Sequence, residues 1–357
     1  MPAMKIWIDI LTPKQVNLFS IFTKRLAEQG HEVFLTARHY RELEQLLQIR
    51  GMNAKIVGRH GGGDLTNKLV ESSKRVTELV RHVANQNPQL AISFCSPEAA
   101  RVAYGLRIPH YAICDSPHAE SVCRLSLPLS KRLFTPRVIP KSAWRQYGIS
   151  SSKIVRYNAL DPAAWIRYYA STSDMRSSMG LDEHKPVVVL RTEEEYASYL
   201  QQDQRPTKSI ITQLVRPVTE LGAQVVVMPR YEEQVETLTR DLSGMGEVLP
   251  RVIDAIRLLS CTSFFVGAGG TMCAEAALMG VPTVSCYPSK PTYVDRYLCK
   301  LGLLERTLSP SEIVDRIRRC LDHPEIAVNQ KTRASRLLAR MEDPVSVIMS
   351  HLGLSGK

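Results

Sequence analysis

Short apolar runs alternate with helix-length amphipathic segments along the first half of the chain. The runs KIWIDI, EVFLTA, AKIV, LAIS and PHYAIC are separated by segments, such as 16–29 and 65–85, whose apolar residues recur at helical spacing. Strand-length runs that alternate with helices predict a parallel sheet wrapped by helices. The sequence therefore predicts an α/β fold.

The same alternation restarts in the second half after a break. Between residues 157 and 186 the periodicity fades into Asp-Pro and clusters of Ser, Thr and Asp, which are typical of a connection. Beyond it, VVVL, AQVVVMP, GEVL, SFFVGA and PTVSCY read as strands, and helical patterns lie between them. The chain after residue 310 reads as two or three helices broken near two prolines.

We therefore predict two Rossmann-like, doubly wound domains that face a cleft. The first covers residues 1–160, a linker covers 161–186, and the second domain covers 187–340. A C-terminal helix over 341–357 could pack back on the first domain. Because ligands of open parallel sheets bind beyond the carboxyl ends of the strands, functional residues are expected in the strand-to-helix loops.

The net charge of +11 lies entirely in the first half of the chain. Residues 1–165 contain 23 Lys and Arg against 12 Asp and Glu, whereas residues 166–357 contain 23 of each class. This asymmetry predicts a polyanionic or membrane-surface partner for the first domain, with a solvated basic surface as the alternative. The sequence contains no familiar RNA or DNA module and no aromatic residues interleaved with the charges, which disfavours nucleic acid.

The apolar segments and cysteines predict a cytoplasmic protein. No apolar run approaches the roughly 18 residues of a membrane span, and the first one is too short for an export signal. The eight cysteines have neither C-x-x-C nor zinc-type spacing, so we expect them to be reduced and no metal to be bound. Contact with the inner face of the membrane would be peripheral.

A glycine-rich elbow in the second half carries the strongest functional signal. In FFVGAGGTMCAEAALMGVP, a strand ends in Gly267, Gly269 and Gly270, and Thr271 opens a helix that contains Glu275. A strand that turns through glycines into a helix presents free backbone N–H groups and the positive end of the helix dipole to one point, which suits a phosphate. Thr271 could cap the helix, and Glu275 could accept hydrogen bonds from a ribose. The alternative is tight strand-to-helix packing with a solvated helix acid.

This elbow resembles the nucleotide-diphosphate loop of GT-B glycosyltransferases and of the related non-hydrolysing UDP-N-acetylglucosamine 2-epimerases. With MKIWIDILTPKQVNLF and DSPHAESVCRLSLPLSKRLFTP, nearly the whole chain resembles an archaeal and bacterial family catalogued as a domain of unknown function and placed near those groups. The resemblance implies a GT-B fold and a UDP-linked sugar held by the second domain, with no further cofactor. It also implies that Arg191 and Arg230 approach the phosphates, although a surface ion pair would explain either arginine.

Two loops of the first domain are candidates for the other side of the cleft. CDSPHAES places Asp115, His118 and Glu120 after a strand; His118 is the first choice of general base, and Asp115 could orient it or replace it. Capping by Asp115 or Ser116 and an i,i+4 pair between Glu120 and Arg124 are the structural alternatives.

The acceptor side is predicted from two further stretches of the first domain. DILTPKQVN places Thr12, Lys14 and Gln15 at a helix start, where helix capping alone is the alternative. GRHGGGDLTNKL, residues 58–69, reads as a glycine-rich loop that carries His60 and could close over an acceptor.

Three functions remain in order of preference. The first is a metal-independent glycosyltransferase that moves a sugar from a nucleotide diphosphate to an anionic or lipid-phosphate acceptor. The second is a nucleotide-sugar 2-epimerase, for which Asp115, Glu120 and Glu193 could supply carboxylates, although TPKQ replaces the arginine-rich first loop of that group. The third is a non-catalytic protein that binds nucleotide sugars or nucleic acid. The oligomeric state is not predicted.

Overall fold

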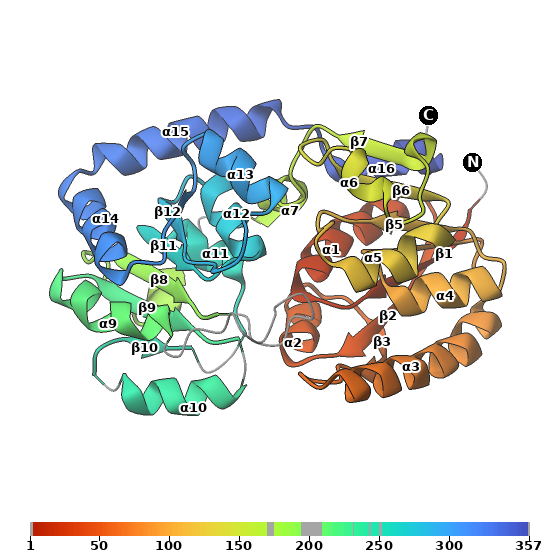
Figure 1. Ribbon diagram of the computed structural model, residues 1–357, viewed down its shortest axis with the longest axis horizontal. Helices are drawn as coiled ribbons and strands as arrows, with labels where there is room; N and C mark the ends of the chain where they lie inside the picture. The colour runs from red at the N-terminus through yellow and green to blue at the C-terminus, as the bar shows by residue number, and fades with distance from the viewer. Residues whose placement is uncertain are drawn as a thin grey trace. The chain divides into compact units, whose positions relative to one another are not determined.

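The computed structural model describes residues 3–169, 175–193, 209–230, 232–242, 244–249 and 252–355. The chain divides into two compact units. The first unit contains Met1–Trp165 and Glu342–Lys357, and the second contains Ile166–Met341. In Figure 1 most of the first unit runs from red to yellow and most of the second from green to blue. Each unit is built around one parallel sheet.

The sheet of the first unit has the order β3-β2-β1-β4-β5-β6-β7. Its strands are β1 (Lys5–Ile10), β2 (Glu32–His39), β3 (Ala54–Arg59), β4 (Leu90–Ser93), β5 (His110–Ile113), β6 (Arg132–Pro136) and β7 (Ile154–Tyr157). All paired strands are parallel, and the order reverses between β1 and β4. This reversal is the switch point of a doubly wound fold. Strands β6 and β7 were not predicted, because each is only four or five residues long and contains an arginine.

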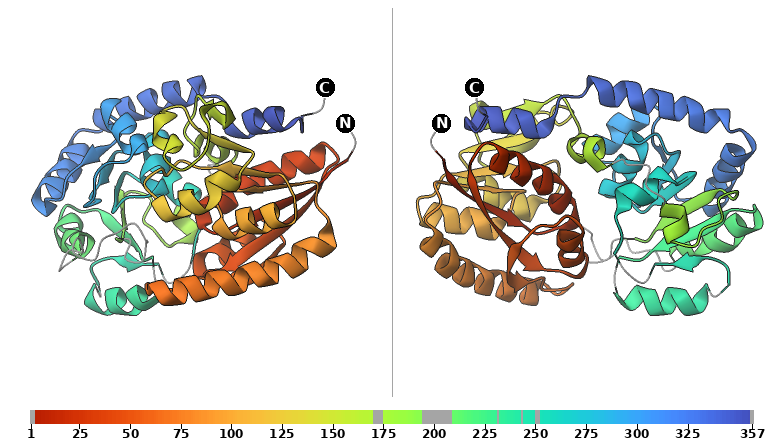
Figure 2. Two further views of the ribbon diagram at one scale, coloured as in Figure 1. Left: turned by 45° about the vertical axis from the view of Figure 1, so that its right-hand side comes forward. Right: turned by 180° about the vertical axis from the view of Figure 1, so that it is seen from behind.

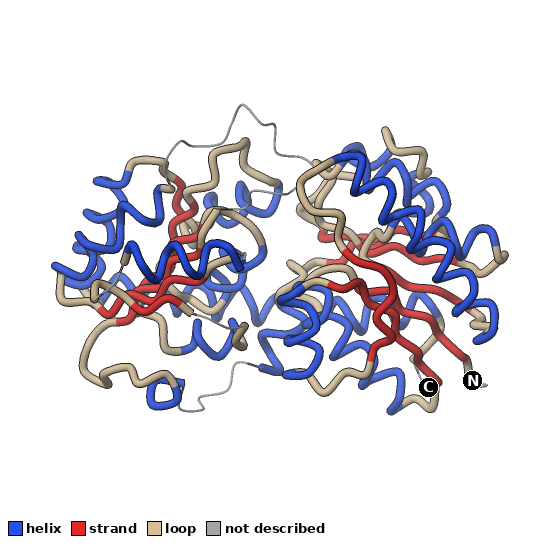
Figure 3. The backbone as a smooth tube through the Cα atoms, turned by 90° about the horizontal axis from the view of Figure 1, so that it is seen from below, coloured by secondary structure: helices blue, strands red, loops and turns tan. Residues whose placement is uncertain are grey.

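Helices cover both faces of this first sheet, as Figure 3 shows. They are α1 (Pro13–Glu28), α2 (Arg41–Ile49), α3 (Leu65–Gln86), α4 (Pro97–Gly105), α5 (Glu120–Ser126), α6 (Ser142–Arg145) and α16 (Pro344–Leu352), with short 3-10 turns at Leu127–Leu129 and Ser151–Lys153. Helix α1 contacts α2 and α16, whereas α3 contacts α4. Thr12 is the N-cap of α1 and Pro13 its first residue, as predicted, because proline lacks only an N–H that the first turn leaves unpaired.

The C-terminal helix α16 belongs to the first unit. Asp343 caps it through the Val345 N–H at 3.2 Å and forms an ion pair with Arg25 of α1. Just before the cap, the Glu342 N–H donates to the Asn158 carbonyl at 3.1 Å. Figure 2 shows this helix from two further sides. The end of the chain is thus fastened to a helix and to a loop of the first unit.

The sheet of the second unit has the order β10-β9-β8-β11-β12-β13 and is also parallel. Its strands are β8 (Val187–Arg191), β9 (Gln224–Met228), β10 (Glu247–Val248), β11 (Phe264–Gly267), β12 (Thr283–Ser285) and β13 (Glu305–Arg306). The first five strands correspond to the five predicted runs. The two-residue strand β13 was not predicted, because Glu305 and Arg306 form no apolar run.

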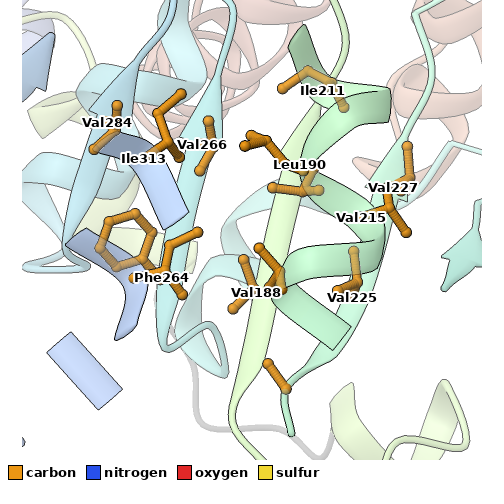
Figure 4. Packing of buried hydrophobic residues seen from close by; sticks show 14 of the residues in the cluster. Val188, Leu190, Ile211, Val215, Val225, Val227, Phe264, Val266, Val284 and Ile313 are labelled. Atoms are coloured by element: carbon orange, nitrogen blue, oxygen red, sulfur yellow. The ribbon is translucent and has the colours of Figure 1, made fainter. Parts of the chain in front are cut away.

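The helices of the second unit pack the apolar faces of this sheet. They are α8 (Met175–Ser178), α9 (Ile210–Glu220), α10 (Glu232–Asp241), α11 (Ala255–Ser260), α12 (Thr271–Leu278), α13 (Tyr293–Lys300), α14 (Pro310–Asp322) and α15 (Glu325–Arg340). Figure 4 shows part of the core, in which Ile211 and Val215 of α9 pack with strand residues such as Val188, Leu190 and Val266. The sheet is buried in this cluster, as the unbroken apolar runs predict.

The segment predicted as a linker contains helical structure. Helix α7 (Ala163–Tyr169) includes the division between the units, and α8 follows it. The Arg167 guanidinium donates to the carbonyls of Leu338 and Met341 at 2.6 and 2.7 Å. Residues 170–174 of this segment lie outside the described residues. In the part of the chain that the structure describes, no helix is both long and apolar enough to cross a membrane.

Candidate functional site

The glycine elbow of the second unit lies at the switch point of its sheet. Strands β8 and β11 are neighbours there, and β9 lies on the other side of β8. The carboxyl ends of these three strands and the loops that follow them carry Arg191, Arg230 and the segment from Gly267 to Gly270. Predicted donor-binding residues from three separate stretches of sequence are therefore at one edge of one sheet, where doubly wound folds bind their ligands.

The backbone of the elbow requires glycine at two positions. Gly269 and Gly270 have φ values of 87° and 90°, in the region that side chains disfavour. A Cβ atom on Gly269 would approach the ring of Tyr287 to 2.8 Å, and one on Gly267 would approach Cys273 Sγ to 2.9 Å. Gly270, not Thr271, is the N-cap of α12, so the predicted capping role of Thr271 is wrong. Thr271 is instead the first residue of the helix, because glycine better adopts the positive φ of this cap.

Glu275 is on α12, one turn after Thr271, and its side chain is buried with the residue only 3% exposed. A solvated helix acid, the structural alternative considered from the sequence, is therefore wrong. A carboxylate at this depth needs hydrogen-bond or charge partners, because burial of an uncompensated charge is costly. This burial is compatible with a carboxylate that grips a bound hydroxyl, and that role stays a prediction.

Arg230 is fixed against the elbow by its own hydrogen bonds. Its Nη2 donates to the carbonyl of Gly269 at 3.1 Å and its Nε donates to the carbonyl of Thr192 at 2.9 Å. The Arg230 backbone N–H donates to the side chains of Thr192 and Gln234, at 3.1 and 2.9 Å. The guanidinium is thus held next to the start of α12, where the helix dipole is also positive.

Arg191 is buried at the end of β8 and donates from Nη1 to the carbonyl of Pro229 at 2.7 Å. Its neighbour Glu193 has a structural role: the carboxylate accepts from the Ser209 hydroxyl at 2.7 Å and from the Ile210 N–H at 2.9 Å. Glu193 therefore satisfies the N-terminus of α9, a position where a carboxylate is stabilised by the helix dipole. This removes one of the three carboxylates considered for an epimerase.

Replacing Gly269 by alanine is expected to lower the free energy of unfolding by about 1–3 kcal/mol, because the new Cβ meets both a disfavoured φ and the Tyr287 ring. Gly222→Ala is the matched control, because Gly222 has a φ of 81° but nothing within 4 Å of its Cβ position. If both variants lose the same stability, the Tyr287 contact does not shape the elbow.

The first unit gathers a lysine and two aspartates at the carboxyl edge of its sheet. Lys14, in the first turn of α1, forms ion pairs with Asp115 after β5 and with Asp161 after β7; the Nζ–Oδ2 distance to Asp161 is 2.7 Å. Asp161 is 1% exposed and its Oδ1 accepts from the Tyr157 hydroxyl at 2.5 Å. Lys14 Nζ also lies 4.2 Å from the centre of the Phe94 ring. We call these residues, Lys14, Asp115, Asp161 and Tyr157, the lysine–aspartate cluster.

The charges of the cluster shift its pKa values in different directions. Burial alone would lower the pKa of Lys14, but the carboxylates of Asp115 and Asp161 outweigh it and raise that pKa. Burial opposes ionisation of Asp115, yet Lys14 holds its pKa below the ordinary value. Burial and the nearby Asp115 charge raise the pKa of Asp161 to about 6, although Lys14 acts against them. One ammonium therefore serves two unequal carboxylates, and Asp161 is the one that can hold a proton near neutral pH.

Asp161 was not predicted as a site residue, because NALDPAAW was read as the start of a linker. The Asp-Pro pair that suggested a connection instead precedes α7, and Asp161 lies beside the first helix of the chain. The signal in the sequence was an isolated acid just after an apolar segment. Only the pairing of β7 with β6 brings it to the same edge as Asp115.

The other two predicted catalytic residues, His118 and Glu120, follow β5 and differ in their contacts. His118 is exposed, and its charge is close enough to lower the pKa of Asp115, although burial and Lys14 act more strongly on that carboxyl. Glu120 is exposed and its Oε1 lies 2.7 Å from Arg124 Nε, the i,i+4 pair that was the structural alternative. Neither Asp115 nor Ser116 caps α5; the Ser116 hydroxyl donates to Asp115 at 2.8 Å. The structure thus leaves His118 exposed in the same loop as Asp115 and gives Glu120 a surface pair.

The predicted acceptor-side residues Thr12, Gln15 and His60 differ in burial and in their hydrogen bonds. Thr12 is the N-cap of α1 without a side-chain capping bond. Gln15 is buried and structural: its Oε1 accepts from the Leu11 N–H at 2.6 Å and its Nε2 donates to the Phe94 carbonyl at 3.5 Å. His60 is half-buried, accepts at Nδ1 from the Gly62 N–H at 3.1 Å and packs edge-on against Tyr40.

The loop within the glycine-rich stretch 58–69 is shorter than predicted. Strand β3 ends at Arg59 and α3 begins at Leu65, with Asp64 as its N-cap. The Asp64 side chain accepts from the Asn67 N–H at 2.8 Å, so a capping acid starts the helix directly after the glycines.

A buried ion pair that the sequence analysis did not consider lies beneath the same edge. Asp9 of β1 is fully buried, and the two guanidinium nitrogens of Arg75 contact its carboxylate oxygens at 2.6 and 3.1 Å. The hydroxyls of Thr36 and Ser96 donate to the same carboxylate at 2.6 and 2.7 Å. Burial opposes the charge of Asp9, but Arg75 outweighs it and lowers the pKa of Asp9. This network joins β1, β2, α3 and the start of α4.

All eight cysteines are free in the structure, and six of them are buried. Within the described ranges, no group of three or more His, Cys, Asp and Glu side chains is arranged to hold a metal ion.

Comparison with known proteins identifies relatives without an assigned activity. The model of a family described as "Protein of unknown function (DUF354)" matches residues 4–353. An uncharacterized protein of Methanocaldococcus jannaschii is 31% identical over 317 residues, which cover 87% of this chain and 90% of that protein. The resemblance inferred from the sequence is confirmed.

Solved structures share the fold at low identity. MnaA of S. aureus in a co-structure with UDP has a TM-score of 0.72 and 15% identity, with 99% of this chain and 98% of that chain covered. A UDP-GlcNAc 2-epimerase of M. jannaschii in complex with UDP-GlcNAc and UDP has a TM-score of 0.69 and 14% identity, with 99% and 100% covered. The glycosyltransferase VinC in complex with dTDP has a TM-score of 0.61 and 15% identity, with 98% and 99% covered. The predicted GT-B fold of two parallel α/β domains is confirmed, and the fold alone does not separate transferases from epimerases.

Proposed function

Since the chain belongs to the DUF354 family of proteins of unknown function, we propose that it is a glycosyltransferase that uses a nucleotide-diphosphate sugar and no metal. The observation that supports this most is the glycine elbow at the switch point of the second sheet. The free N–H groups at the start of α12, the helix dipole and the anchored Arg230 place positive potential at one point. A departing nucleotide diphosphate is stabilised by such fixed donors without reorganisation.

Several relatives in fold support a uridine nucleotide as the donor. The S. aureus structure contains UDP and the M. jannaschii epimerase contains UDP-GlcNAc and UDP, whereas the VinC structure contains dTDP. In the proposed enzyme, the elbow holds the diphosphate, Arg191 and Arg230 contribute charge, and Glu275 accepts hydrogen bonds from the ribose hydroxyls. Thr271 donates its hydroxyl to a phosphate oxygen.

The first unit supplies the groups that handle the acceptor proton. In this proposal His118 takes the proton of the attacking hydroxyl, and Asp115 stabilises the imidazolium that forms. Lys14 keeps Asp115 ionised, and the lowered pKa of that carboxyl supports this role. An anionic or lipid-phosphate acceptor fits the positive charge of residues 1–165. Peripheral contact with the inner face of a membrane belongs to the same proposal.

An epimerase is the second candidate, and the lysine–aspartate cluster is the observation that favours it. Such an enzyme needs one carboxylate that accepts a proton and one acid that donates it. The cluster contains two unlike carboxyl groups, because the pKa of Asp161 is raised to about 6 and the pKa of Asp115 is lowered. Against it, the Glu193 carboxylate accepts from the Ser209 hydroxyl and the Ile210 N–H at the start of α9, and Glu120 pairs with Arg124. We therefore retain the transferase.

A panel of nucleotide sugars, first ranked by thermal shift, separates these functions. A transferase releases UDP only when an acceptor is present. An epimerase changes the sugar without an acceptor. A binding protein stabilised by the nucleotide sugar does neither, and that result would reject the enzymatic proposal.

Replacing Glu275 by glutamine is expected to weaken UDP binding by about 1–3 kcal/mol, because a charged hydrogen-bond acceptor for the ribose is lost. Calorimetry with UDP measures the change. Glu220→Gln is the control in the same unit, since Glu220 forms an exposed pair with Arg216. UDP affinity equal to that of the wild type in Glu275→Gln, with the fold intact, would reject the ribose assignment.

A further inference from the structure

Three buried cysteines meet beneath the loop that follows β5. Cys95 and Cys114 lie just after the neighbouring parallel strands β4 and β5, and Cys123 is in α5, the next helix along the chain. All three side chains are buried. The Cys114 thiol has the thiols of both Cys95 and Cys123 as hydrogen-bond partners. The fold thus gathers three sulfur atoms from separate elements.

The backbone of Ser116 positions two of these thiols. Its N–H donates to Cys114 Sγ, with N and Sγ 3.5 Å apart, and its carbonyl accepts from the Cys123 thiol, with Sγ and O 3.6 Å apart. The Cys114 N–H donates to the carbonyl of Phe134 on β6 at 3.0 Å, so the start of the loop is held by the sheet. Cys114 and Cys123 are therefore fixed by the two backbone groups of one residue.

Cys114 differs from the other two cysteines in its ionisation. Hydrogen bonds from the Cys123 and Cys95 thiols lower the pKa of Cys114, although burial and the Asp115 charge oppose them. The hydrogen bonds to Cys114, together with burial, raise the pKa of Cys123 and of Cys95. The thiolate is the nucleophilic form of cysteine. The cluster thus pairs one nucleophilic sulfur with two protonated thiols.

We propose that Cys114 and Cys123 form a disulfide when the protein is exposed to a hydroperoxide, and that this bond reshapes the loop carrying Asp115 and His118. First, the Cys114 sulfur attacks a peroxide oxygen; the S–O bond forms, the O–O bond breaks and hydroxide leaves. Next, the Cys123 sulfur attacks the sulfenic acid; the S–S bond forms, the S–O bond breaks, and the oxygen leaves as water with the Cys123 proton. The two sulfurs lose two electrons, which reduce the peroxide.

This disulfide would close the loop that holds the proposed general base. Residues 115–122 lie between the two cysteines and include Asp115 and His118. A covalent bond requires the two sulfurs to be closer than hydrogen-bonded thiols are, so the ends of the loop must approach each other. The inference goes beyond the proposed function, because the disulfide can form whether or not the protein transfers a sugar.

Peptide mapping of the full-length protein after treatment with hydrogen peroxide tests this inference. The remaining thiols are blocked with N-ethylmaleimide in denaturant, and trypsin is added without a reductant. Because residues 115–122 contain no Lys or Arg, Cys114 and Cys123 stay in one tryptic peptide, 108–124, whereas Cys95 is in peptide 82–101. Peptide 108–124 should lose the mass of two hydrogen atoms and take up no maleimide. Dithiothreitol added before the blocking step should reverse both changes.

Cys320 is the internal control in the same digest. It is buried like the pair, burial raises its pKa to about 11, and no second thiol is among the described groups that shift this pKa. It should therefore remain a thiol and react with maleimide. Cys123→Ser is a second control, because the sulfenic acid on Cys114 then loses its nearest partner. Dimedone, which traps sulfenic acids, should label Cys114 in this variant and not in the wild type.

Acceptor-dependent UDP release measures the effect of the bond on the loop. The oxidised protein should turn over about 10- to 100-fold more slowly, because a shift of about 1 Å in a catalytic group has an effect on that scale. Dithiothreitol should restore the rate, and UDP binding should be unchanged, since the nucleotide is assigned to the second unit. A disulfide that leaves turnover unchanged would contradict the reshaped loop.

Two results of the mapping would overturn the disulfide itself. One is maleimide on both thiols of peptide 108–124 after peroxide treatment of the folded protein. The other is a cross-link between peptides 82–101 and 108–124, which would make Cys95 the partner of the bond. An absence of turnover in the reduced protein would concern the proposed function alone, because peptide mapping does not require activity.

Discussion

Replacing Arg75 by methionine is expected to lower the free energy of unfolding by about 3–5 kcal/mol. The change leaves the carboxylate of Asp9, which is 0% exposed, without its bidentate partner. Removal of one member of a buried ion pair costs this much because the remaining charge stays desolvated. The hydroxyls of Thr36 and Ser96 still donate to Asp9, but they carry no compensating charge. Urea unfolding followed by circular dichroism measures the loss.

The pH dependence of this loss distinguishes a charge effect from a packing effect. Arg75 keeps the pKa of Asp9 below its ordinary value, so in the wild type Asp9 contributes stability above its unfolded pKa and loses it as the pH falls. In the variant, Asp9 escapes the penalty when it is protonated. The wild type and Arg75→Met should therefore differ less at about pH 4 than at about pH 7. A loss that is equal at both pH values would mean that only packing is affected.

Two further variants complete the test. Asp9→Asn/Arg75→Met removes both charges, so it should be more stable than Arg75→Met alone. Arg81→Met changes an exposed arginine of the same helix and should stay within about 0.5 kcal/mol of the wild type. If Arg75→Met loses no more stability than Arg81→Met, the buried pair does not hold the first sheet together.

The periodicity of the sequence was sufficient for the fold because both sheets are parallel and buried. Runs such as VVVL became fully buried strands, and Thr12-Pro13 marked a helix start where the structure has one. The prediction missed strands that are defined by pairing with neighbouring strands. β6 and β7 are only five and four residues long, and they are defined by pairing with β5 and with each other.

The candidate site was less predictable than the fold, since side-chain partners are set by tertiary contacts. From the sequence, Lys14 was assigned to the acceptor side and Asp115 to catalysis. In the structure they form one ion pair across 101 positions of the chain. Asp161 was missed because an acid before a proline is also typical of a loop. Glu193 was considered for catalysis, and only the tertiary structure shows that its carboxylate accepts from the first N–H of α9. Glycines were the exception, because a positive φ restricts residue type locally and is therefore visible in sequence.

Replacing His118 by alanine is expected to lower the rate of acceptor-dependent UDP release about 100-fold, because a general base contributes on that scale. Binding of UDP should be unchanged, since the nucleotide is assigned to the second unit. Steady-state turnover and calorimetry measure the two quantities separately. His323→Ala is the control, as this exposed histidine follows α14 in the other unit.

Asp115→Asn makes the same test sharper because it preserves shape and removes the charge beside His118. If Asp115 stabilises an imidazolium that forms during transfer, turnover should fall in Asp115→Asn but fall little further in the double variant with His118→Ala. Independent losses that multiply would instead mean that the two residues act separately. Wild-type turnover in His118→Ala, together with a large loss in Asp115→Asn, would transfer the proton chemistry to the lysine–aspartate cluster and favour the epimerase.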